Sequence, residues 1–397
     1  MASLLDLPDE VLLVILEHLS IADIGQTAQV CRRLSDLIGQ DAVWRPISKH
    51  LINIHEDEDE TKNCNYYKTG SPRYVSLKDK CRISLNWSRG QKTDILLCKF
   101  KTRYLPWLQL DGQHLYSSQG DKVHCYRLTD QGRIFKKPLV SFLGQLGDVS
   151  RFVVRKDKLL MSGCDGKMLL HHKLTGALLG CYQPEHHLPS FVNFTSVDMT
   201  DDVIIGGLND QCIHLWSLHS QQRALTIPVL DRVWSVNASP CQRSFATGNA
   251  GTADHQPLKI WDIENGKHIL SVGRNWRHGA GILDMQYESQ NTLLSCGYDT
   301  TVRMWDLRTN CLSPVIKLED PHDYTVYRLQ SDGKFLIASG TALWSVARLW
   351  DKRMNSELQS FFVDHRRNSP VYGLQFNGSH MYVALNNSLR ALSFTGN

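Results

Sequence analysis

Apolar and polar residues alternate along most of this chain as they do in β-strands, and one strand-like phrase recurs at a regular interval. The phrases are VHCYRL, MLLHHKL, CIHLWSL, LKIWDI, VRMWDL, ARLWDK and SLRALSF. One equivalent position is occupied in turn by Tyr126, His172, Trp216, Trp261, Trp305, Trp350 and Leu392. Successive members lie 42 to 46 residues apart, which matches the four-stranded blade of a β-propeller. The pattern therefore predicts an all-β propeller of seven blades over residues 91–397.

Residues 1–47 follow the helical period instead. We expect Pro8 at the first helical position and a helix from there to about Leu19, because acidic residues directly after a proline are typical of a helix N-terminus. Its apolar stripe is expected to consist of Val11, Leu12, Ile15, Leu16 and Leu19. Leu13 and Val14 continue the apolar surface around the helix, which is more than a small bundle can cover. Another molecule is expected to bury the remainder.

Two shorter helices are expected in the rest of this small all-α head. Ser20 and Asp23 can cap the second helix, and Gly39 can end the third. The third helix carries the apolar residues Val30, Leu34, Leu37 and Ile38. A bundle of this size is marginally stable by itself and exposes apolar surface, so the pattern is typical of a docking domain.

A partly helical linker is expected over residues 48–90. It opens with an acidic run at 55–60, which is typical of a solvated loop. A more regular segment from Tyr74 to Leu85 has apolar residues available for packing. The final repeat phrase is the third strand of its blade, and the chain stops before a fourth. Residues 93–100 have strand composition, so we expect them to supply the missing strand and close the ring.

Composition narrows the functional classes. The net charge is +4, but residues 1–47 hold three basic and seven acidic side chains, which gives that segment −4 and leaves +8 for the rest. The longest apolar run, 11–16, is far too short to cross a bilayer. Eleven cysteines without a C-x-x-C pair suit buried thiols in a reducing compartment. We therefore expect a protein that is cytoplasmic, nuclear or both, is not secreted, and has no membrane partner, metal or cofactor.

The head also carries a specific motif. It contains LPDEVLLVILEHL, then VCRR and then WR, and in this order the phrases resemble an F-box along its whole length. The resemblance implies a surface that binds a Skp-type adaptor, through which a cullin and a RING subunit are joined indirectly. By matching position, the implied adaptor-binding residues are Leu7, Pro8, Ile15, Leu16, Val30, Cys31, Leu34 and Trp44. A purely structural interpretation also exists, since Leu16, Val30 and Leu34 could fill the core of the bundle. We expect both roles within the set.

A second resemblance meets the first in the expected order. The phrase NWSRG at 86–90 resembles the junction at which F-box/WD-repeat proteins enter their propeller, and the divergent phrases with the short C-terminus resemble the dactylin-type branch. Such proteins are substrate-recognition subunits of Skp-cullin-F-box ubiquitin ligases and are not enzymes themselves. The resemblance implies a substrate face formed by segments before each first strand and by turns between second and third strands. The implied substrate residues are Tyr104, Arg232, Tyr298, Tyr324, Trp344, Arg366 and Arg367.

Competing interpretations remain open at this point. His278, Ser295, Asp299 and Trp305 could suggest a hydrolase, but they recur in phase with the blades and match the hydrogen-bond set of WD repeats. That set predicts an indole donating to Ser295, with the serine and Asp299 partnering His278. A propeller scaffold that assembles proteins without ubiquitination is the alternative function. Nucleic-acid binding is disfavoured, because the positive charge is modest and interspersed with acids.

Overall fold

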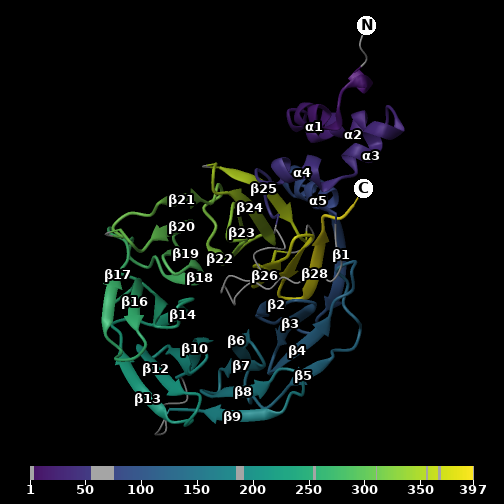
Figure 1. Cartoon of the computed structure of the whole chain (residues 1–397). Coiled ribbons are helices and arrows are strands. Elements are labelled where there is room, and N and C mark those ends of the chain that lie inside the picture. The colour runs from purple at the N-terminus through teal and green to yellow at the C-terminus, as the bar shows by residue number, and fades with distance from the viewer. Residues whose placement is uncertain are drawn as a thin grey trace.

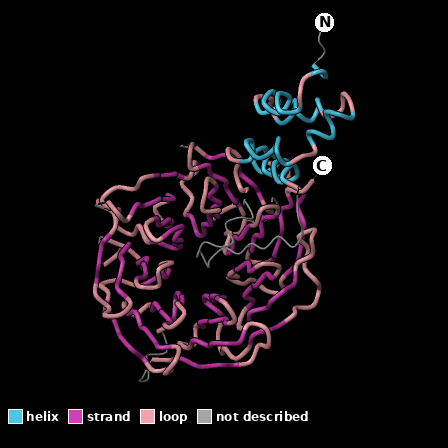
Figure 2. The backbone as a smooth tube through the Cα atoms, in the orientation of Figure 1, coloured by secondary structure: helices cyan, strands magenta, loops and turns pink. Residues whose placement is uncertain are grey.

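The computed structural model describes residues 4–54, 76–184, 192–253, 256–309, 311–354, 356–364 and 368–396. Figure 1 shows a ring of small sheets with a helical head beside one edge, close to the C-terminus. Figure 2 shows that, among the described residues, the helices gather in this head while strands and loops make up the ring. The predicted combination of an all-α head and an all-β seven-bladed propeller is confirmed.

The described residues of the head and linker form a 3₁₀ turn and five helices. They are η1 (Leu4–Asp6), α1 (Asp9–Glu17), α2 (Ile21–Thr27), α3 (Arg32–Ile38), α4 (Asp41–Ser48) and α5 (Leu77–Arg89). Pro8 is the N-cap of α1 rather than its first helical residue. The Oγ atom of Ser20 accepts a hydrogen bond from the backbone N–H of Asp23, and Gly39 is the C-cap of α3, so both predicted boundary signals are confirmed.

The ring consists of seven antiparallel four-stranded sheets. Blade 1 contains β2 (Leu108–Asp111), β3 (His114–Gln119), β4 (Lys122–Arg127) and β5 (Val140–Phe142). Blade 2 contains β6 (Val149–Arg155), β7 (Lys158–Gly163), β8 (Met168–His172) and β9 (Leu178–Tyr182). Blade 3 contains β10 (Phe194–Met199), β11 (Val203–Leu208), β12 (Cys212–Ser217) and β13 (Arg223–Pro228). Blade 4 contains β14 (Val233–Ala238), β15 (Ser244–Asn249), β16 (Leu258–Asp262) and β17 (His268–Ser271).

The remaining blades follow the same order. Blade 5 contains β18 (Ile282–Ser289), β19 (Thr292–Gly297), β20 (Thr301–Asp306) and β21 (Ile316–Glu319). Blade 6 contains β22 (Val326–Ser331), β23 (Leu336–Thr341), β24 (Val346–Asp351) and β25 (Glu357–Phe362). Blade 7 contains β26 (Gly373–Phe376), β27 (His380–Ala384), β28 (Ser388–Ser393) and β1 (Thr93–Lys99). All seven repeat positions lie in the third strand of their blade, as the sequence pattern predicts.

The two ends of the propeller meet in blade 7. Strand β1 pairs with β28 in an antiparallel register that places Thr93 opposite Ser393 and Lys99 opposite Ser388. An ion pair between Asp94 and Arg390, with 3.2 Å between carboxylate and guanidinium, joins the same two strands. The predicted closing strand is therefore confirmed, and it removes the open edge that blade 7 would otherwise present.

The core of the ring is divided into clusters that each join two neighbouring blades, and the head has a cluster of its own. Between blades 4 and 5, for example, Leu258 and Ile260 pack with Ile282 and Trp305. The repeat tryptophans also hold the second and third strands together, since the indole of Trp305 donates to the Ser295 hydroxyl at 2.9 Å. Matching bonds run from Trp261 to Thr247 and from Trp350 to Ser339. Most of the ring is thus stabilised by repeated, local packing.

The predicted hydrogen-bond set of blade 5 is formed only in its tryptophan–serine half. The Asp299 carboxylate is predicted to partner His278 but instead pairs with Arg303, whose guanidinium lies over the Trp276 ring at 4.6 Å. The His278 side chain is exposed, and its Nε2 atom lies 3.1 Å from the Thr252 carbonyl oxygen. An arginine two residues before the repeat tryptophan out-competes the histidine, because a charged donor binds a buried carboxylate more strongly.

Candidate functional site

Several aliphatic side chains of the head are exposed. Helix α1 buries Leu12 and Leu16, whereas Val11, Val14 and Ile15 face outward, so the expected single stripe is in fact two stripes on different sides of the helix. Val14 is 55% exposed and Val30, before α3, is 71% exposed. We define the head stripe as the exposed apolar residues of this domain: Leu4, Leu5, Val11, Val14, Ile15 and Val30. This much exposed aliphatic surface on so small a domain is typical of a docking site.

The residues matched to the F-box motif divide between this surface and the core. Pro8, Ile15 and Val30 are exposed, so the core role considered for Val30 is wrong. Leu7 and Cys31 are half-buried. The remaining members, Leu16, Leu34 and Trp44, are buried in the core of the head. The indole of Trp44 donates to the Ile38 carbonyl at 2.7 Å, so its place in the bundle is fixed by packing and by a hydrogen bond.

Arg33 holds the N-terminal turn against the third helix, a role that the sequence pattern does not reveal. Its guanidinium donates to the carbonyl oxygens of Leu5 and Leu7 and to the carboxylate of Asp9, the last at 2.6 Å. Three acceptors converge on one planar cation, which suits the fork geometry of arginine. The clamp keeps η1 and the start of α1 beside α3, and so keeps the head stripe together.

Helix α5 joins the head to the ring. Trp87 is fully buried, stacks on Phe394 with 3.7 Å between ring centroids, and donates from its indole to the Gly378 carbonyl at 3.0 Å. Asn86 donates to the carbonyl oxygens of Phe394 and Gly396. The asparagine and tryptophan of the predicted junction are therefore the residues that seat the helix on blade 7.

The junction continues around the base of blades 6 and 7. The Asn53 amide donates to the Asn377 carbonyl at 3.0 Å, and the Arg353 guanidinium donates to the His50 carbonyl at 2.9 Å. Ile52, Ile83 and Trp87 belong to the same buried cluster as the apolar residues between these two blades. Because linker and ring share one core, the head is held in a fixed position relative to the disc.

The predicted substrate residues are spread over several blades and are not brought together. The Tyr104 ring packs edge-on against Phe100, Arg232 is exposed beside blade 4, and Tyr324 lies next to His322. Tyr298 and Trp344 are exposed in the turns between second and third strands of blades 5 and 6. The predicted pair Arg366 and Arg367 lies outside the described residues.

An aromatic arc on the same face extends from blade 4 to blade 7. We define it as Trp234, Tyr298, Tyr327 and Tyr372. The Trp234 and Tyr298 ring centroids are 5.0 Å apart, and those of Tyr327 and Tyr372 are 5.9 Å apart. Burial, with the neighbouring Tyr327 hydroxyl, raises the pKa of Tyr298. Only Tyr298 is predicted from the sequence. The other three share the second position of a first strand, or directly precede it, and that shared position is the signal that could reveal them.

Charged residues from opposite sides of the ring meet in its centre. Arg151 of blade 2 pairs with Asp284 of blade 5 at 3.0 Å, and both are almost completely buried. The guanidinium carbons of Arg151 and Arg328 each lie 3.8 Å from the ring centroid of Trp107. Burial lowers the pKa of Arg328 to about 10. This cross-channel cluster ties blades 1, 2, 5 and 6 together at the level just below the aromatic arc.

The described ranges hold neither a metal-binding group nor a membrane-spanning helix. They contain no group of three or more histidine, cysteine or acidic side chains placed to hold a metal ion. Among the same residues, no helix combines the length and apolar character that crossing a membrane requires. We call the face of the ring that carries the aromatic arc and the turns between second and third strands the loop-bearing face.

Comparisons with known proteins agree with this architecture. The F-box-like family model matches residues 4–50. The chain is 37% identical over 397 residues to the mouse F-box/WD repeat-containing protein 4, covering 98% of this chain and 92% of the relative, and 36% identical to its human counterpart with the same coverage. The WD40 β-propeller domain of Doa1 has the same fold, with a TM-score of 0.57 and 17% identity over 76% of this chain and 97% of that domain. The chain belongs to the F-box/WD repeat-containing protein family.

Proposed function

We propose that this protein is the substrate-recognition subunit of a Skp-cullin-F-box ubiquitin ligase. The observation that carries the proposal is the head stripe, an exposed aliphatic surface on a domain that is fixed to the ring. A Skp-type adaptor covers the stripe and connects the protein to a cullin and a RING subunit. Leu7, Pro8, Ile15, Val30 and Cys31 contact the adaptor, while Leu16, Leu34 and Trp44 keep that surface in shape from within.

The mechanism is one of proximity, and no residue of this chain performs chemistry. The loop-bearing face of the ring holds a protein substrate, and a separate ubiquitin-charged enzyme transfers ubiquitin to a lysine of that substrate. A fixed junction raises the effective concentration of the lysine, because the substrate cannot swing away from the transfer enzyme. The burial of Trp87 in a core shared by linker and ring supports this role.

A pull-down from cells tests the proposal with one surface substitution. Val14→Asp places a charge in the head stripe, and Val315→Asp changes a valine on the ring that is similarly exposed, at 59%, and serves as the matched control. We expect wild type and Val315→Asp to recover the adaptor and the cullin, and Val14→Asp to lose both. If wild type recovers neither, the ligase role is wrong and a propeller scaffold without ubiquitination becomes the better hypothesis.

A further inference from the structure

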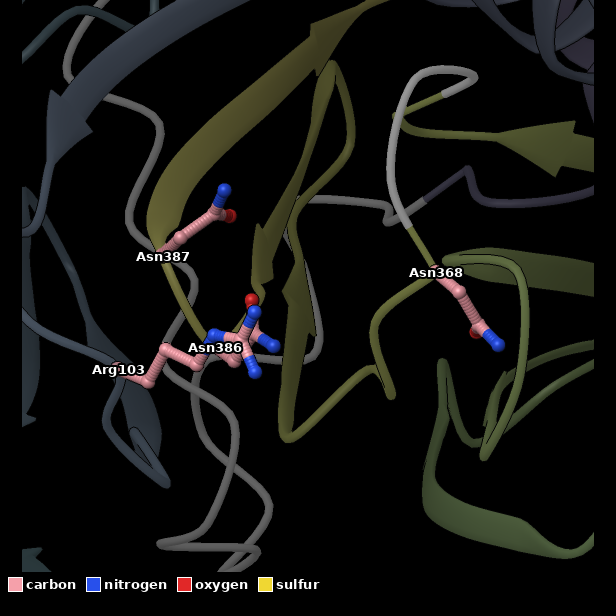
Figure 3. Close-up of a pocket in the computed structure, with 4 residues that line it drawn as sticks. All are labelled: Arg103, Asn368, Asn386 and Asn387. Carbon is pink, nitrogen blue, oxygen red and sulfur yellow. The ribbon is translucent and has the colours of Figure 1, made fainter.

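A polar hollow of about 280 Å³ opens on the loop-bearing face at blade 7. Its described lining residues are Arg103, Asn368, Asn386 and Asn387. Figure 3 shows Arg103 and Asn386 approaching each other from two loops, with Asn368 on the other side of the hollow in this view. One arginine and three asparagine residues therefore form the described lining, which includes no acidic side chain.

The loops around the hollow are fixed by the backbone. The N–H of Tyr104 donates to the Asn386 carbonyl, and that of Phe100 donates to the Asn387 carbonyl, both at 2.8 Å. The N–H of Asn386 donates to the Ser369 hydroxyl at 3.0 Å. Segments from before β2, before β26 and between β27 and β28 are thereby held together, so the lining groups are positioned in advance of any ligand.

The side chains that line the hollow offer more hydrogen-bond donors than acceptors. The Oδ1 atom of Asn368 accepts from the Trp344 backbone N–H at 2.8 Å, and the Oδ1 atom of Asn387 accepts from the Ser388 hydroxyl at 3.1 Å. Their NH₂ groups are left as donors. Arg103 offers only donors and is exposed, with no ion pair to another described residue. A ligand with oxygen acceptors and one negative charge would complete this arrangement.

Trp344 provides an apolar surface beside the hollow. It is 52% exposed, and its backbone is bonded to Asn368. Its φ angle is 59°, and that of Ser345 is 55°, so two consecutive residues with side chains occupy the left-handed region. Glycine or asparagine usually fills such positions, and a bulky residue there is an outlier that points to function. An aromatic ring is thus held out towards solvent next to the donor groups.

Resting on the proposed substrate-receptor function, we infer that this hollow binds a carboxylate of the substrate, with a neighbouring apolar side chain of that substrate against Trp344. The carboxylate can belong to an aspartate, a glutamate or a chain terminus. A phosphate carries about −1.5 to −2 charges at neutral pH, which the one guanidinium and the neutral amides among the described lining residues balance poorly. The described part of the lining therefore fits a carboxylate better than a phosphate.

Binding of the purified full chain to arrays of random nonapeptides tests this inference. The arrays differ at one fixed central residue, which is Glu, Gln or phosphoserine, and each is made with a free or an amidated C-terminus. We expect at least about tenfold stronger binding where a carboxylate is present than where its amide replaces it, as befits a charge-assisted pair. Comparing the peptides that have a central Glu with those that have a free C-terminus shows whether a side-chain carboxylate or a terminal carboxylate is bound. Stronger binding to the phosphoserine peptides would overturn the inference.

Two variants connect the result to the hollow. Arg103→Gln is expected to remove the preference for a carboxylate, whereas Lys101→Gln, which removes a positive charge from the same loop, is expected to retain it. Equal binding by Arg103→Gln and wild type, with unchanged melting curves, would contradict the inference. The adaptor pull-down gives an independent result. If carboxylate peptides bind while no adaptor is recovered, the inference about the hollow is supported and the ligase role is refuted. If the adaptor is recovered while carboxylate peptides do not bind, only the ligase role is supported.

Discussion

The head and the ring differ in how far they bury their apolar side chains. Helix α1 leaves three of its aliphatic residues exposed, whereas the repeat tryptophans of the ring are buried, and the indoles of Trp261, Trp305 and Trp350 donate to the neighbouring strand. The ring closes on itself through β1 and β28 and completes its own core. The head buries a smaller core of its own and leaves the head stripe exposed. The two domains therefore differ in the surface that they offer: the head presents exposed aliphatic side chains, and the ring presents loops on a closed scaffold.

A substitution in the junction between head and ring is expected to have the largest effect on stability. Trp87→Ala removes a fully buried ring that stacks on Phe394, and it removes the stronger of two donors to the Gly378 carbonyl, which the Asn53 amide also contacts at 3.3 Å. We expect a loss of about 3–5 kcal/mol in the free energy of unfolding, measured by urea denaturation. Small-angle scattering should show a wider range of head positions. A variant that keeps both stability and shape would mean that the head is not fixed through α5.

Substitutions on the buried and exposed sides of α1 distinguish effects on stability from effects on adaptor binding. Leu16→Ala creates a cavity in the core of the head and is expected to cost about 2–5 kcal/mol of stability. Val14→Asp lies on the surface, so we expect stability to change by less than about 0.5 kcal/mol while adaptor affinity falls tenfold or more. Calorimetric titration with the adaptor and thermal melting measure the two effects. If Val14→Asp unfolds the head, the exposed stripe is structural.

We expect a buried histidine at the start of β27 to make stability depend on pH. His380 is buried in blade 7, and burial lowers its pKa to about 4. Its unfolded pKa is higher, about 6.5, so the unfolded chain binds a proton first as the pH falls. Stability from this group is therefore complete above about pH 6.5 and is lost towards pH 4, by roughly 3 kcal/mol. In His380→Gln, the free energy of unfolding measured between pH 6.5 and pH 4 should fall by a correspondingly smaller amount. A fall as large as that of wild type would contradict the burial of a neutral imidazole.

The smallest expected effect concerns the strained turn of blade 6. Trp344→Gly removes a side chain from a backbone position with φ of 59° and relieves its strain. We expect stability to stay constant or to rise by about 1 kcal/mol, while binding of carboxylate peptides is lost. Denaturation and peptide binding on the same preparation check both effects. A large loss of stability would show that Trp344 serves the fold rather than recognition.

Sequence pattern alone predicts the repeated and local parts of this molecule. The seven third strands, the closing strand and the caps at Ser20 and Gly39 follow from periodicity and from short-range hydrogen bonding, which the sequence displays directly. The division of α1 into two stripes was not predictable, because the small bundle buries only Leu12 and Leu16 fully and apolar residues occur all round the helix. Burial beneath neighbours, not residue type, separates Leu16 from Ile15.

Contacts between distant segments are harder to predict. Arg151 and Asp284 are 133 residues apart and meet only because the ring closes. Trp107 and Arg328 join them from two other blades, and each of these residues taken alone would pass for ordinary strand surface. The polar hollow at blade 7 likewise combines loops from both ends of the propeller sequence. Such sites depend on three-dimensional closure, which residue spacing does not encode locally.

Hydrogen–deuterium exchange of the full chain, with and without the Skp-type adaptor, tests the central claim most directly. We expect slower exchange in η1, in α1 and around Val30, with the loop-bearing face of the ring unchanged. Protection confined to that face, or no protection of the head at saturating adaptor, would contradict the assignment of the head stripe as the adaptor-binding surface.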